Sequence, residues 1–185
     1  MELKKGNLKL SKKVGVWTIP ASLSICGRVC KGCYAHKSQN QYKQALAYRT
    51  RNYEASLLPD FENEKIVGFD IIRVHESGEF YSQEYINKWV NIARNHPNIV
   101  FYAYTKRIGE FNFDELTSLK NFVLHNSLHK GKENYGKDIS EVAETCGGFV
   151  CPLTLQKDWH GKCGHDCTWC MQKKNEGTPI FFEKH

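Results

Sequence analysis

Short apolar runs alternate along this chain with longer stretches of helical periodicity. The strand-like runs cover residues 14–19, 66–74, 99–104 and 122–124. The stretches with apolar residues at three- and four-residue steps cover 39–58, 82–96 and 114–120. Strands that alternate with helices need crossover connections, and these make the strands parallel, with helices outside. The pattern therefore predicts an α/β fold.

The helix expected after residue 82 has the clearest end signals. Ser82 can accept hydrogen bonds from the free amides of a first turn, Glu84 suits the positive end of the helix dipole, and Pro97 closes the helix.

The alternation of strand-like and helix-like segments ends beyond His125. A polar stretch precedes a modest helix expected at 139–145, and residues 179–182 could form a last strand. We divide the chain into an α/β cluster-binding domain (1–145) and a Cys-rich metal-binding segment (146–185) packed on the same domain.

Composition narrows the class of protein. A length of 185 residues suits one domain, and 41% hydrophobic residues exclude wholesale disorder. No apolar run approaches the roughly 20 residues of a membrane span, and no hydrophobic signal region follows the start. We expect a soluble, cytoplasmic protein. The net charge of +6 is partly local, because five lysines lie within residues 1–13. This basic arm is either solvated or in contact with an acidic partner.

Eight cysteines in a reducing cytoplasm indicate metal ligation more than disulfides. Cys26, Cys30 and Cys33 follow the first strand, with three and then two residues between them. Glycines in this loop allow the tight turn that a cubane iron–sulfur cluster needs, and three thiolates leave the fourth iron open. A zinc knuckle with a distant fourth ligand, or redox and structural thiols, are the alternatives.

The same spacing recurs near the carboxyl end, at Cys163, Cys167 and Cys170, preceded by Cys146 and Cys151. A closed four-cysteine site there would hold a second cluster or zinc. Alternatively, Cys151 completes the first site and leaves no open iron. The nearby His160 and His165 are either ligands or solvated loop residues.

In parallel α/β sheets, ligands bind beyond the carboxyl ends of the strands. The first cysteine motif, residues 75–79, residues 105–106 and residues 126–127 each follow one predicted strand, so we expect them to share one edge.

Several side chains at this edge have two readings. His75 could carry a proton or ligate iron, or be a hydrogen-bonded packing residue. Arg73 could neutralise the cluster or grip a carboxylate, or form a salt bridge beneath the edge. Lys106 is likewise either a site residue or a structural one. Tyr104 fits the apolar core better than the site.

The first cysteine motif resembles the cluster motif of radical S-adenosylmethionine enzymes, although Gly32 replaces the aromatic residue common before the third cysteine. The segment Ser77-Gly78-Glu79 resembles their Gly-Gly-Glu segment, which holds the methionyl amino group. The resemblance implies a partial (βα) barrel-like open sheet, one [4Fe-4S] cluster or two, and S-adenosylmethionine as cosubstrate. Together with the expected common edge, this resemblance predicts catalytic roles for His75, Glu79 and Lys106. The same argument predicts cofactor binding by Arg73, Ser77, Gly78, Glu79 and Asn126.

A closer resemblance, over most of the chain, is to the phage-encoded gene-product-88-like family. It lies in residues 8–13, 33–35, 73–80 and 101–106 and in the cysteine-rich tail. This resemblance implies an iron–sulfur protein without a settled reaction, located in the cytoplasm of a bacterial host.

Two functional classes follow. The first is a radical S-adenosylmethionine-type enzyme that needs a small-molecule cosubstrate and an electron donor. The second is a non-catalytic module, stabilised by iron–sulfur or zinc, that binds nucleic acid or a host protein; its affinity for nucleic acid would fall steeply with salt. Neither class involves a membrane.

Overall fold

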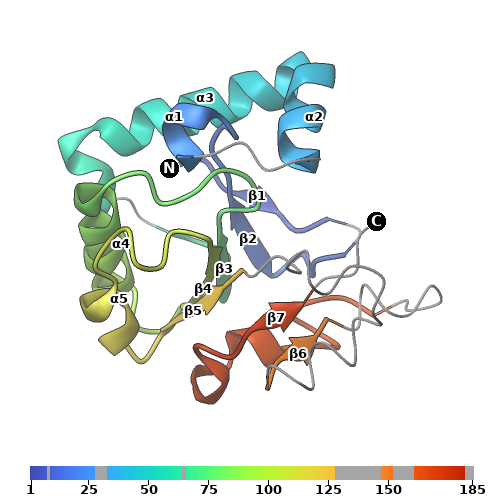
Figure 1. The fold of residues 1–185 in the computed structure, drawn as a ribbon, viewed down its shortest axis with the longest axis vertical. Coiled ribbons are helices and arrows are strands. Elements are labelled where there is room, and N and C mark those ends of the chain that lie inside the picture. The colour runs from blue at the N-terminus through green and yellow to red at the C-terminus, as the bar shows by residue number, and fades with distance from the viewer. Residues whose placement is uncertain (8, 28–32, 64–65, 128–146, 152–160, 182–185) are drawn as a thin grey trace.

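The computed structural model describes residues 1–7, 9–27, 33–63, 66–127, 147–151 and 161–181. Five strands form one sheet in chain order (Figure 1). They are β1 (Lys4–Lys5), β2 (Val14–Trp17), β3 (Ile71–Val74), β4 (Val100–Thr105) and β5 (Phe122–Asn126). β1 is antiparallel to β2, whereas β2 to β5 are all parallel. The predicted α/β fold with parallel strands is confirmed.

The helices of the amino-terminal part are α1 (Leu23–Cys26), α2 (Tyr34–Gln41), α3 (Lys43–Leu57), η1 (Pro59–Asn63), α4 (Gln83–Asn95) and α5 (Asp114–Ser118). The tail contains β6 (Phe149–Val150), η3 (Trp169–Met171), η4 (Lys173–Asn175) and β7 (Ile180–Phe181). Ser82 caps α4 as expected, because its hydroxyl accepts a hydrogen bond from the Tyr85 amide at 3.1 Å. The expected last strand is confirmed as β7, which pairs in parallel with β6.

The two faces of the sheet are covered by different parts of the chain. Trp17, Ile72, Phe101 and Phe122 face the helices and are fully buried in the larger apolar cluster. The residues that alternate with these, such as Val16, Tyr102 and Val123, belong to a second cluster with Cys151, Cys170, Met171 and Ile180. The sheet therefore lies between a helical layer and the tail, which Figure 1 shows on opposite sides.

The tail also covers the outer edge of β5. The Leu124 amide donates to Glu176 Oε1 at 3.1 Å, and the Gly177 amide donates to the Leu124 carbonyl at 3.3 Å. The Lys173 ammonium donates to the Phe122 carbonyl at 2.9 Å. An edge strand exposes unpaired backbone groups, and these contacts satisfy them.

Three sequence-based expectations differ from the structure. The helix expected at 39–58 is two helices that meet at Tyr42. The strand expected at 66–74 begins only at Ile71, because Gly68 has a φ of +82° and Val67 is 81% exposed. The basic arm is not simply solvated, since β1 pairs with β2 although its two lysines are exposed. The helix expected at 139–145 lies outside the described residues.

A buried polar network closes the helix-side core beside the end of β3. Trp17 Nε1 donates to the Tyr85 hydroxyl at 2.7 Å, and this hydroxyl lies 3.0 Å from His75 Nε2. The hydroxyl still has its own proton, which Nε2 can accept when the imidazole proton is on Nδ1. The His75 ring also packs edge-on against Phe80, and its burial lowers the pKa to about 3. His75 is neutral at physiological pH.

This depressed pKa predicts a specific acid sensitivity. The unfolded chain takes up a proton on His75 below pH about 6.5, whereas the folded protein excludes it until pH about 3, so stability is lost as the pH falls through this window. Between pH 7.5 and 5.0 this group should destabilise the fold by about 2 kcal/mol. His75→Asn should remove that share and keep the backbone, because Asn tolerates the observed φ of +66°. Urea unfolding of both chains at both pH values measures the difference, and an equal loss in both would contradict it.

Within the described residues, no helix combines the length and apolar character needed to cross a membrane.

Candidate functional site

The carboxyl ends of β2 to β5 meet at one edge of the sheet, and the segments after them contact one another. The Ile19 amide donates to the Ser77 carbonyl at 3.1 Å, which joins the segments after β2 and β3. The Tyr34 hydroxyl donates to the Glu76 carbonyl at 2.9 Å. Asn126 pairs in register with Thr105 at the ends of β5 and β4. We call this region the carboxyl edge; it brings together the segments that the sequence analysis expected to meet.

Glu79 connects the segment after β3 to the end of β4. Its carboxylate accepts hydrogen bonds from the Thr105 hydroxyl at 2.7 Å, the Lys106 amide at 3.0 Å and the Phe80 amide at 3.2 Å. Burial raises the pKa of Glu79, while these three donors act in the opposite direction. A carboxylate has about four lone-pair sites, so one acceptor position is left for a further donor.

The first cysteine motif lies at the same edge. Cys26 ends α1, and Cys33 caps α2 by accepting a hydrogen bond from the His36 amide at 3.4 Å. Cys30 lies outside the described residues. Burial lowers the pKa of Arg49, and the nearby Glu76, Tyr34 and Cys33 raise it, which places these groups together.

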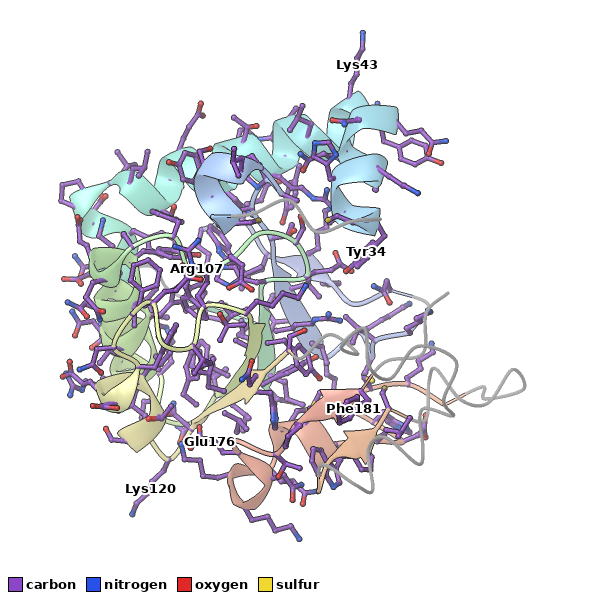
Figure 2. All side chains as sticks on the ribbon, in the orientation of Figure 1. Tyr34, Lys43, Arg107, Lys120, Glu176 and Phe181 are labelled. Carbon is purple, nitrogen blue, oxygen red and sulfur yellow. The ribbon has the colours of Figure 1, made fainter. Side chains whose placement is uncertain are left out.

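Arg107 supports the end of α1 from the segment after β4. A side chain at Gly27 would collide with the Arg107 guanidinium, with the added Cβ only 1.9 Å from Nη1. Figure 2 shows Tyr34 at the start of α2 and Arg107 near the end of α1. Arg107 also forms an ion pair with Glu110 at 2.9 Å. The segment after β4 therefore fixes one end of the first cysteine motif.

Four buried polar atoms near the ends of β2 and β3 have no hydrogen-bond partner in the described part of the chain. They are Thr18 Oγ1, Arg73 Nε, His75 Nδ1 and Ser77 Oγ. All four can donate, and a buried donor without an acceptor costs about 1–3 kcal/mol. Their concentration on two adjacent strands suits a ligand that carries acceptor or anionic groups.

The remaining predicted site residues have mainly backbone roles in the structure. Gly78 has a φ of +87° and lies so close to Ile19 that an added Cβ would be 2.3 Å from Ile19 Cγ1. Only glycine combines this conformation with this approach. Lys106 is half-buried and contributes its amide to Glu79, and Asn126 is half-buried at the end of β5.

The described tail cysteines lie on the opposite side of the sheet from the helices. Cys151, Cys163 and Cys170 pack with Tyr102 in the second apolar cluster. The backbones of Cys163 and Cys167 pair in an isolated β-bridge. Burial raises the pKa of Cys163 to about 12 and that of Cys170 to about 11, and neighbouring cysteines add to both shifts. As free thiols, these two are protonated at neutral pH.

Arg73 is positioned between the carboxyl edge and the tail. Its guanidinium lies over the Tyr104 ring at 5.6 Å from the centroid. Burial raises the pKa values of Tyr34 at the carboxyl edge and of Cys163 and Cys170 in the tail, and the charge of Arg73 offsets part of each rise. The salt bridge expected beneath the edge is not found among the described residues, where no carboxylate lies within ion-pair distance of Arg73.

Across the described ranges, no three His, Cys, Asp or Glu side chains already stand in positions that could hold a metal ion. His165 is exposed and pairs with Asp166 at 2.8 Å, which fits its reading as a solvated loop residue. Cys146 and His160 lie outside the described residues.

The sequence analysis did not single out Thr18, Arg49 or Arg107, whose partners are distant in the chain. Only the charge of Arg49 within a helical apolar pattern gave a signal.

The comparisons with known proteins agree on one family. The model of the family described as Gene product 88 matches residues 1–158. The Gene 88 protein of Mycobacterium phage L5 is 26% identical over 106 residues, and that of Mycobacterium phage D29 is 24% identical over 106 residues. Each alignment covers 49% of this chain and 43% of the relative, so the chain spans less than half the length of the curated relatives it matches. No solved structure matches. The chain belongs to the Gene product 88 family.

Proposed function

We propose that this protein is an iron–sulfur enzyme of the radical S-adenosylmethionine type. Cys26, Cys30 and Cys33 would bind a [4Fe-4S] cluster and leave one iron open to the cosubstrate. The observation that carries the proposal is the meeting of the described part of this motif with the Glu79 segment and unpartnered donors at the carboxyl edge.

The strand order supports the finer description of the fold. Strands β2 to β5 are adjacent in chain order, and α1, η1, α4 and α5 all contribute to the apolar cluster on one face. A segment of a (βα) barrel has this arrangement. We therefore include a partial barrel-like sheet in the proposal.

The residues of the carboxyl edge provide complementary groups for an amino acid moiety. The remaining acceptor position of Glu79 suits the ammonium of S-adenosylmethionine, and the donors on Ser77 and His75 suit its carboxylate. Because His75 is neutral, we assign it a hydrogen bond to the ligand and not proton transfer. Lys106 and Asn126, at the ends of β4 and β5, would face the substrate.

When bound, the reduced cluster would supply one electron for cleavage of the cosubstrate's sulfonium bond, giving methionine and a carbon radical. The protein's part is to hold the cosubstrate and exclude water. The proposal also requires a substrate for the radical and an electron donor.

Anaerobic reconstitution tests this function. With iron and sulfide the protein should gain the brown colour of a cubane cluster, and after reduction it should convert S-adenosylmethionine to methionine and 5′-deoxyadenosine. Serine at Cys26, Cys30 or Cys33 should abolish this cleavage, because each removes a cluster ligand. Cys146→Ser, outside both cysteine triads, is the matched control and should retain it.

A sample with a full cluster that neither binds nor cleaves S-adenosylmethionine would refute the enzymatic proposal. That outcome would favour the alternative of a metal-stabilised binding module, whereas a colourless sample with only zinc would exclude the cluster itself.

Glu79→Gln separates cosubstrate binding from cluster binding. The amide replaces one acceptor oxygen with a donor that faces other donors, and it removes the charge that would pair with the cosubstrate ammonium. We expect cosubstrate affinity to fall about tenfold or more, with iron content unchanged. Thr105→Val removes one donor to Glu79 but keeps its carboxylate, so it should weaken binding less. Equilibrium binding to the reconstituted protein measures both, and wild-type affinity in Glu79→Gln would contradict the assignment.

A further inference from the structure

The described tail cysteines are held against the sheet by specific backbone contacts. The Cys163 amide donates to the Lys9 carbonyl at 2.9 Å, and the Ser11 amide donates to the Cys163 carbonyl at 2.9 Å. The ring of His125, on β5, lies with Nε2 2.9 Å from the Cys170 carbonyl. These contacts come from two separate parts of the amino-terminal region, so the tail has a defined position on the sheet.

The four thiols at Cys151, Cys163, Cys167 and Cys170 lie within one region of this layer. Three belong to the same apolar cluster, and the turn between Cys163 and Cys167 is closed by a hydrogen bond from the Gly164 amide to the Cys167 carbonyl at 2.9 Å. The backbones of Cys163 and Cys167 also pair in an isolated β-bridge, which keeps these two residues next to each other. Gly164 touches Val14 of β2, where an added Cβ would be 2.4 Å from Cγ2, so this turn lies directly against the sheet.

Arg73 presents a positive charge to the same layer. Its side chain lies on the tail side of β3, because the alternate residues Ile72 and Val74 face the helices. Its Nε is buried and has no hydrogen-bond partner among the described residues, and the aromatic face of Tyr104 gives only weak compensation for a full positive charge. Arg73 is half-buried, and a partly desolvated guanidinium is stabilised by an anionic partner.

We propose that Cys151, Cys163, Cys167 and Cys170 form a closed four-thiolate metal centre and that Arg73 is its counter-ion. Zinc and a [4Fe-4S]²⁺ cluster both have a formal net charge of −2 with four thiolates, so either meets the charge that Arg73 presents. Metal binding releases the four thiol protons, and the guanidinium donates to ligand sulfurs. The four thiols must close by side-chain rotation, since no three already stand at coordinating positions in the described part.

This centre goes beyond the function proposed above and is independent of it. Its ligands come from the tail, whereas Cys26 and Cys33 lie at the ends of α1 and α2. It assigns Cys151 to the tail site, with Cys163 and Cys170, and not to the first cysteine motif. Arg73 becomes a positioning residue for the tail centre, and it would connect the end of β3 to the bound metal.

The test uses the full chain with serine at Cys26, Cys30 and Cys33, so that only the tail thiols remain. One arm supplies Zn²⁺ or Co²⁺, whose visible spectrum reports tetrahedral thiolate ligation, and the other supplies iron and sulfide anaerobically. We expect one centre per chain in one of the arms and its loss in Cys163→Ser or Cys170→Ser. The same two variants in the otherwise unchanged chain should also lose one centre. They provide the test if the chain with three serines does not fold.

Variants of Arg73 then test the counter-ion. Arg73→Met keeps the apolar length but removes the charge, so chelator competition should show metal affinity reduced about tenfold to a hundredfold. Arg73→Lys should restore part of that affinity, because it restores the charge without the planar guanidinium. The control Arg51→Met removes an exposed arginine that pairs with Glu2, and it should leave affinity unchanged. Wild-type affinity in Arg73→Met would overturn the counter-ion role. No metal in either arm, or full metal after loss of Cys163 and Cys170, would overturn the centre.

Discussion

The order of the parallel strands is the constraint on which the rest of the structure depends. Each connection from β2 to β5 leads to the next strand of the sheet, and crossovers of one hand then place all their helices on the same face. The other face still carries apolar side chains such as Val16, Tyr102 and Val123, which must be removed from water. A full barrel buries this face by closing on itself. Here the tail covers it.

The tail is a poor hydrophobic layer for this purpose. Its described part contains two-residue strands and single 3₁₀ turns, and its buried contacts include Cys151, Cys170, Met171 and Ile180. A small segment with so little regular structure usually needs a covalent or metal link to hold its shape. The concentration of cysteines in the layer with the least secondary structure therefore has a physical reason, whatever chemistry the carboxyl edge performs.

The sequence predicted the elements whose signals are local. The strand pattern, the Ser82 cap of α4 and the convergence of segments after the strands all follow from periodicity and from the geometry of parallel sheets. The predictions were wrong where a distant partner overrides the local pattern. In α3 the buried residues include Arg49, Asn52 and Ser56, whereas the apolar Leu57 is 52% exposed.

This inverted face of α3 has specific causes. The Arg49 guanidinium donates to the Ala35 carbonyl at 2.9 Å, which holds α2 against α3. The Asn52 amide donates to the carbonyls of Glu2 and Thr18, which lie at the same end of the antiparallel β1–β2 pair, before β1 and after β2. Apolar periodicity carries no information about such hydrogen bonds, so the break at Tyr42 and the pairing of β1 could not be read from it.

The last residues of β3 show how one strand serves both layers. Strand alternation sends Arg73 to the tail side and Val74 to the helix side, and continued alternation would bring His75 back beside Arg73. The left-handed backbone at His75, with φ of +66°, ends the strand, and the imidazole instead bonds to Tyr85 in the helix-side core. The imidazole is thus kept away from the thiols. The change of direction at His75 leaves Arg73 as the cation of β3 that faces the tail, and it starts the segment that carries Ser77 and Glu79 to the carboxyl edge.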